Sequence, residues 1–188
     1  MAITINGSGT IGGVSVGGLP DGIVDTDMLA AGAVTAAKRG TGAILQVVQA
    51  STSTEVEVNT QTFTDTNLSG SITPQSTSSK ILVIIDQAFY ANRAAVNHGM
   101  GLKILRDSTE IHSPTANSIG PYEFYYAATS GFYDRAVIHK LDSPATTSSV
   151  TYKTQGRPYE ISSDGRIYYQ VGGTVDATSY ITLIEVAG

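Results

Sequence analysis

The sequence predicts an all-β protein: a jelly-roll-like antiparallel β-sandwich head over residues 43–188, preceded by a short stem over residues 1–42. Three observations lead to this prediction. From Ala43 onward, short apolar or alternating runs follow one another, turn residues separate these runs, and no helical period appears after Gly42. Short strands with such punctuation are typical of β-sandwiches and jelly rolls.

The stem differs from the head in composition. Residues 3–19 alternate short β-formers with glycine, and Asn6-Gly7 between apolar pairs predicts a β-hairpin. After Pro20 we expect a one-turn helix over residues 27–31 and a second short helix or tight turn over residues 34–38. The segment is too rich in small residues to build a core, yet apolar enough to need burial. We therefore expect other chains to order it.

The expected strands of the head fall between turn clusters rich in Ser, Pro, Asp and Gly. They cover residues 43–49, 55–58, 61–68, 71–73, 80–90, 99–106, 110–112, 122–128, 133–140, 149–155, 166–171 and 180–186.

Three of these strands are almost continuously apolar: Ile44–Val48, Ile81–Ile85 and Ile181–Val186. A sandwich strand with one solvated face should alternate instead. Either a neighbouring subunit or long loops must cover the second face, and we favour the subunit. Glu185 inside the last run should face solvent or a satisfied partner. The residues expected at the oligomer interface are Leu45, Val47, Ile81, Val83, Ile85 and Ile184.

Composition excludes several classes of protein. Charged residues make up 14% of the 188 residues, against about 25% in typical soluble domains, which favours stacking against copies or other shell proteins. The net charge of −5 and the lack of a basic cluster argue against a nucleic-acid partner. There is no cysteine for disulfides or thiolate zinc sites. We see no signal peptide and no apolar stretch of membrane-spanning length, so we expect synthesis in a cytoplasm without membrane insertion.

No motif predicts catalysis, and no cofactor is expected. His98 and His112 could approach one another, but scattered histidines are more often ordinary surface or interface residues than metal ligands, so no metal is expected. No Gly-x-Ser-x-Gly elbow or phosphate-binding glycine loop occurs. Asp86 is the one acid that looks enclosed, and we expect it to pair across an interface with Arg93 or Lys103.

Aromatic clustering is the best sign of a ligand. Alternation places Tyr122, Phe124 and Tyr126 on one strand face and Tyr125 on the other. One set can fill the core while the other forms an exposed platform for sugar rings, although core or interface tyrosines remain the simpler interpretation. The candidate glycan platform is Tyr122, Phe124, Tyr125, Tyr126, Tyr90 and Asn92.

Residues 15–40 resemble the N-terminal part of bacteriophage tail-fibre and related virion structural proteins. In those proteins a phrase leu-ala-x-gly-ala-val-thr-x-x-lys recurs along a trimeric shaft or attachment region, and Leu29–Lys38 (LAAGAVTAAK) matches it. Residues 72–83 and 179–186 look like the head domain of the same kind of protein. The phrase occurs only once here, unlike in long tail fibres, so a short spike or a head appendage remains a possible interpretation.

The resemblance implies a homotrimeric virion protein, a short tail fibre or spike, that attaches to other phage proteins by its N-terminus and presents its head to a host-surface glycan. The alternatives are a capsid decoration, cement or head-fibre protein without a receptor, and a glycan-degrading spike. The residues expected to mediate attachment to the virion are Ile3, Ile5, Leu19, Met28, Leu29 and Val34.

Overall fold

The chain forms two compact units, Met1–Arg39 and Gly40–Gly188. The computed structural model describes residues 4–5, 11–12, 33–35, 38–92, 98–114, 116–117, 120–121, 124–126, 131–159, 165–172 and 177–188. Gly40–Ala43, which we assigned mostly to the stem, belong to the second unit. The Gly42 N–H donates to Ala187 O, and the Ala187 N–H donates to Ala43 O, both at 2.8 Å.

The described residues of the N-terminal unit include one pair of short antiparallel strands. β1 (Thr4–Ile5) lies against β2 (Ile11–Gly12), with Ile5 opposite Ile11, which confirms the strand pairing expected around Asn6-Gly7. Farther along, the Lys38 N–H donates to Thr35 O at 3.0 Å and closes a tight turn. The helix expected over residues 27–31 lies outside the described residues.

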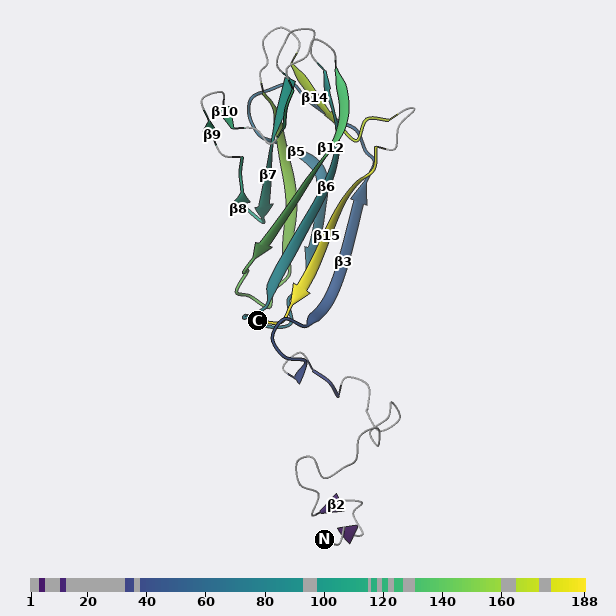
Figure 1. Cartoon of the computed structure of the whole chain (residues 1–188), viewed down its shortest axis with the longest axis vertical. Coiled ribbons are helices and arrows are strands. Elements are labelled where there is room, and N and C mark those ends of the chain that lie inside the picture. The colour runs from purple at the N-terminus through teal and green to yellow at the C-terminus, as the bar shows by residue number, and fades with distance from the viewer. Residues whose placement is uncertain are drawn as a thin grey trace. The chain divides into compact units, whose positions relative to one another are not determined.

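The second unit is an all-β sandwich of two antiparallel sheets (Figure 1). In the first, which we call sheet I, β6 is central. β12 pairs with one edge of β6; β15 and then β14 pair with successive parts of the other edge, β3 lies beyond β15, and β4 lies beyond β14. Its strands are β3 (Ile44–Thr52), β4 (Val56–Val58), β6 (Lys80–Asn92), β12 (Phe132–Asp142), β14 (Arg166–Tyr169) and β15 (Ser179–Val186).

In sheet II, β13 lies between β5 and β7, while β8 and β11 pair with opposite ends of β7. Its strands are β5 (Thr64–Ile72), β7 (His98–Arg106), β8 (Thr109–His112), β11 (Phe124–Tyr126) and β13 (Val150–Pro158). A separate small pair, β9 (Ala116–Asn117) and β10 (Gly120–Pro121), lies in a segment we had expected to be loop.

The long strands pair in a nested order. β7 pairs with β8, β6 with β12, β5 with β13 and β3 with β15, so each pair encloses the preceding one in the sequence. Two further ladders, β15 with β6 and β13 with β7, join these pairs within each sheet. The chain thus crosses between the sheets repeatedly, and its first and last long strands lie side by side.

The core lies between the two sheets. In β5, residues 66, 68, 70 and 72 are buried and residues 65, 67, 69 and 71 are exposed, which is the alternation of a strand with one solvated face. In β6 the odd-numbered residues from 81 to 91 are buried. The largest fully buried side chains of the described core are Tyr152, Tyr169, Leu68, Ile72, Ile81, Ile85, Met100, Leu102, Ile104, Ile167, Ile181 and Leu183.

Most polar groups in this core have hydrogen-bond partners within it, although the buried Ser79 Oγ has none among the described residues. Gln87 Oε1 accepts hydrogen bonds from Thr154 Oγ1 at 2.9 Å and Thr66 Oγ1 at 3.2 Å, and Gln87 Nε2 donates to Ser179 Oγ at 3.0 Å. Glu185 is also fully buried. Its carboxylate accepts hydrogen bonds from Gln46 Nε2 at 2.6 Å and from the Gln75 N–H at 2.7 Å. We expected Glu185 either to face solvent or to have a hydrogen-bonding partner, and the structure shows the second arrangement.

The expected strands agree closely with those observed, with one merger. Residues 61–68 and 71–73 were expected as two strands, but the single strand β5 covers most of both. Gly70 lies where the sheets approach, since a Cβ there would come within 3.2 Å of Ile181 Cγ2. This glycine therefore serves close packing and does not mark a turn.

The two ends of the head are distinct. At one end, which we call the base, the chain begins the head at Gly40–Ala43, beside the C-terminal Ala187. β6 runs from this base to the opposite end, the tip, where it pairs with β14. Figure 1 shows the C-terminus at the base and β14 at the tip.

Candidate functional site

The outer faces of the two sheets differ sharply in character. On sheet II, the residues of β5 and β13 that point away from the core are all polar or charged. The neighbouring strand β7 adds one apolar residue to this face, the half-buried Leu105. This is an ordinary solvated face. These outward residues are Asp65, Asn67, Ser69, Ser71, Thr151, Lys153, Gln155 and Arg157.

On sheet I, many of the outward side chains near the base are apolar, with the polar Gln49, Thr182 and His139 in a row between them. Val47 and Val137 are 57% and 59% exposed, and Ile44 and Leu141 are 60% and 52% exposed. The strand registers place Leu141, Leu82, Ile184 and Val47 in one row across β12, β6, β15 and β3. We call this surface the apolar face; its residues are Ile44, Val47, Leu82, Ile84, Val137, Leu141, Ile184 and Val186.

One ion pair marks the upper border of the apolar face. Arg135 Nε lies 2.6 Å from Asp86 Oδ1, and the Arg135 guanidinium also donates to Thr178 O at 2.8 Å and lies 6.0 Å from the centre of the Tyr180 ring. The expected pairing of Asp86 with Arg93 or Lys103 is therefore replaced by a bond within sheet I. Lys103 pairs with Glu110, and Arg93 lies outside the described residues. The charges of this pair compensate each other.

Toward the tip the same sheet carries a row of tyrosines. The rings of Tyr90 and Tyr133 stack with centroids 4.4 Å apart and an interplanar angle of 27°, and Tyr168 lies 6.1 Å from Tyr90. The register places these residues opposite one another on β12, β6 and β14. The row combines apolar ring faces with hydroxyl groups, which is a combination suited to a sugar or to a protein surface.

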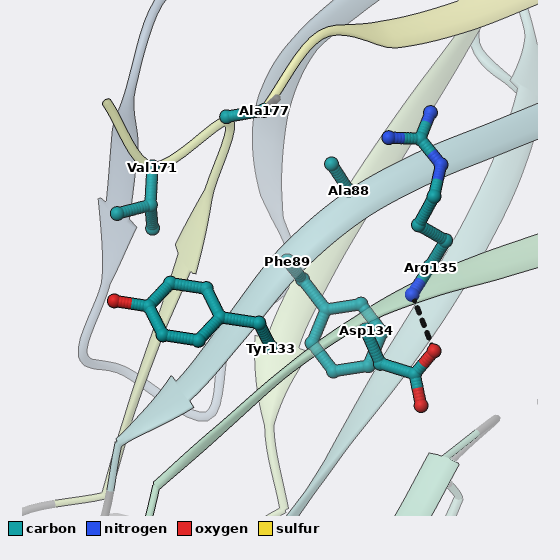
Figure 2. A pocket seen from close by; sticks show the side chains of 7 residues that line it. All are labelled: Ala88, Phe89, Tyr133, Asp134, Arg135, Val171 and Ala177. Carbon is teal, nitrogen blue, oxygen red and sulfur yellow. Dashed lines mark hydrogen bonds between the residues drawn. The ribbon is translucent and has the colours of Figure 1, made fainter. Parts of the chain in front are cut away.

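A pocket of about 210 Å³ lies between the ion pair and this tyrosine row. It is bordered by β6, β12 and the segments after β14 and before β15, and its rim includes the Tyr133 side chain (Figure 2). The Arg135 N–H donates to Asp134 Oδ1 at 2.7 Å at one side. The lining is mainly apolar and comprises Ala88, Phe89, Tyr133, Asp134, Arg135, Val171 and Ala177.

The predicted glycan platform is only partly within the described residues. Tyr90 belongs to the tyrosine row, and Asn92 ends β6 at the tip. Phe124, Tyr125 and Tyr126 form β11, which pairs with the tip end of β7 through Met100, Gly99 and His98. Tyr122 lies outside the described residues. Sequence reasoning missed Tyr133 and Tyr168, which only the strand register brings beside Tyr90.

The structure divides the predicted interface residues between two environments. Ile81, Val83 and Ile85 are completely buried in the chain's own core and Leu45 is 9% exposed, so none of them is available to a second chain. Val47 and Ile184 point outward on the apolar face. The outward residues of the 81–85 run are Leu82 and Ile84, because strand alternation sends neighbours to opposite faces.

Of the predicted attachment residues, Ile5 lies in β1 and Val34 is 47% exposed. Ile3, Leu19, Met28 and Leu29 lie outside the described residues.

The backbone positions of His98 and His112, which could have approached one another, lie at opposite ends of β7. His112 lies opposite Ile104, whereas His98 begins β7 at its other end. Within the described ranges there is no group of three or more His, Cys, Asp or Glu residues placed to hold a metal ion. No helix in the part of the chain that the structure describes is long and apolar enough to cross a membrane.

Comparison with known proteins adds no relative. No protein-family model matches the chain. No curated protein matches it either. The functional argument therefore depends on the residues themselves and on the geometry of the two outer faces.

Proposed function

We propose that this chain is a homotrimeric structural protein of a bacteriophage particle, a short tail fibre or spike. In this proposal the N-terminal unit attaches to other virion proteins, and the head adheres to a glycan of the host surface without catalysis. The resemblance of Leu29–Lys38 to a trimeric shaft phrase suggests the class of protein. The observation that carries the proposal is the contrast between the apolar outer face of sheet I and the polar outer face of sheet II.

We also propose that the head has jelly-roll topology. A jelly roll is a long β-hairpin whose successive strand pairs wrap around two sheets. The nested pairing of β7 with β8, β6 with β12, β5 with β13 and β3 with β15 supports this form. The strand order β3-β15-β6-β12 in one sheet and β5-β13-β7-β8 in the other is consistent with it.

The separation of base and tip supports a role in attachment and display. The N-terminal unit joins the head at the base, while Asn92, β11 and the tyrosine row lie toward the tip. A protein held to a particle at one end presents its other end to the surroundings. Stacking of sugar rings on tyrosine faces would supply the adhesive contact.

Light scattering of the purified full-length chain tests the oligomeric part of the proposal. We expect three times the chain mass, because burial of apolar surface between copies favours assembly. A monomer over the whole concentration range would contradict the proposal. Gold-labelled antibody on phage particles tests location; label on the tail supports a fibre or spike, and label confined to the capsid favours a decoration protein instead.

A further inference from the structure

We propose that the apolar face of sheet I, near the base of the head, is the surface on which the copies of this chain pack against one another. This inference rests on the proposed homotrimer and names the surface that holds the heads together. It differs from the interface expected from the sequence, because Ile81, Val83 and Ile85 are enclosed in the core. Leu82 and Ile84 of the same strand, together with Val47, Val137, Leu141 and Ile184, replace them.

The first argument is the extent of the face. Four neighbouring strands, each contributing seven or eight residues at the usual spacing and rise, cover roughly 500 Å² per copy. In a trimer, three such surfaces total roughly 1,500 Å², or about 500 Å² for each of the three contacts between copies, which is below the roughly 1,000 Å² expected of a specific interface between separate proteins. Joining the chains through their N-terminal units raises the effective concentration of the heads, so a surface of this size is sufficient to hold them together.

The second argument is charge. The ion pair at the border of the face is closed within the chain, with Arg135 Nε 2.6 Å from Asp86 Oδ1. The eight residues of the apolar face are uncharged; beside them, Lys80 lies opposite Val186 at the base and His139 lies opposite Ile84 on β12. Apart from Lys80, two copies can therefore approach without like-charge repulsion, and a strongly acidic or basic partner would find few complementary groups there. A second copy of this chain fits that chemistry.

The third argument is position. Ile44, Leu82, Leu141 and Ile184 lie near the base, and Gly40–Ala43 begin the head at the same end. In a trimer joined through the N-terminal units, the bases of the three heads are the parts held closest together. The apolar face therefore lies near the end of the head to which the N-terminal unit is connected. The tip, with the tyrosine row, stays available for adhesion.

Single cysteines provide a direct test, because the sequence contains no native cysteine. Val137→Cys and Val47→Cys place thiols on the two edge strands of the face, at side chains that are 59% and 57% exposed in a single head. Ser71→Cys places the matched control on the outer face of sheet II. In the full-length trimer we expect the two face thiols to react with a maleimide at least tenfold more slowly than the control.

Charge substitutions provide the second measurement. We expect Val137→Arg and Val47→Arg to shift the full-length protein from trimer to smaller species in sedimentation, at concentrations where wild type and Ser71→Arg remain trimeric. Retained far-ultraviolet circular dichroism would show that the dissociated chain is still folded. If Val137→Arg fails to fold, the thiol reactivity of the cysteine variants still tests whether the apolar face is covered in the trimer.

The outcomes separate this inference from the proposed function. A trimer in which either face thiol reacts as fast as the Ser71→Cys thiol overturns the inference and leaves the homotrimer intact. A wild-type chain that is monomeric at every concentration overturns both. Slow thiols together with dissociation of the arginine variants support the apolar face as the contact between copies.

Discussion

At the scale of single residues, close packing in the core depends on glycines placed opposite large side chains. Gly156 on β13 is the sharpest case, since a Cβ there would lie 1.8 Å from Tyr169 Oη and 2.3 Å from Tyr169 Cζ. Tyr169 is completely buried, and its burial raises the pKa of the phenol, so the hydroxyl stays protonated. Its Oη donates to Met100 Sδ at 3.6 Å. The ring therefore has little freedom to move away from β13.

We predict that Gly156→Ala lowers the free energy of unfolding by about 1–3 kcal/mol, the usual range for overpacking a core. Gly172→Ala is the matched control, because a Cβ at Gly172 would meet no atom within 4 Å. Urea unfolding midpoints of the two variants and wild type provide the measurement. Equal midpoints for Gly156→Ala and Gly172→Ala would show that the Tyr169 ring can move without penalty.

At the scale of the strands, the order of the head could be predicted from sequence patterns to a large extent. Short runs between turn clusters gave strands close to the observed ones, because turn residues and side-chain alternation act locally. The side of the sheet that each run presents to the core could not be predicted for Ile81–Ile85, since a run that is apolar on both faces carries no alternation. Which residues lie opposite one another on neighbouring strands could not be predicted from the sequence either. Asp86 meets Arg135, and Tyr90 meets Tyr133, only through a register that long-range contacts determine.

A cross-strand ion pair and a hydrogen bond also join the edge strand β5 to β13. Asp65 Oδ2 lies 2.9 Å from Lys153 Nζ, and Asp65 Oδ1 accepts from Gln155 Nε2 at 2.7 Å, next to a register shift between residues 153 and 155. Burial raises the pKa of Asp65, but the hydrogen bonds from Lys153 and Gln155 and the nearby Lys153 charge outweigh it, and the pKa lies below its ordinary value of 3.8.

This lowered pKa predicts a stability difference that depends on pH. The interaction stabilises the fold above the unfolded pKa and is lost as pH falls through the folded pKa. Because the Asp65 side chain is 51% exposed, we expect Asp65→Asn to cost less than about 1 kcal/mol at pH 6 and close to nothing at pH 2. Urea midpoints at both pH values test this, and Lys153→Met should reduce the same difference. A cost that is equal at both pH values would contradict the assignment.

At the scale of the whole molecule, the two sheets have different outer faces. Sheet II has a solvated outer face, with outward Asp65, Lys153 and Gln155. Sheet I has outward apolar residues near the base and a tyrosine row toward the tip. The sequence indicated from its continuous apolar runs that some strands have more apolar surface than one sandwich interior can enclose. It could not indicate that all of this surplus lies on one sheet, because that depends on how distant strands assemble.

The nested pairing of the strands has a consequence for how a newly synthesised chain folds. β7 and β8 are neighbours in the sequence, so their contact forms with little loss of chain entropy, whereas β3 must wait for β15, which is synthesised after the other described strands. We expect pulse-labelling hydrogen exchange during refolding to protect amides of β7 earlier than amides of β15. Protection of both at the same time would contradict this order. Because β15 also supplies the centre of the apolar face, a half-made polypeptide cannot present that surface complete.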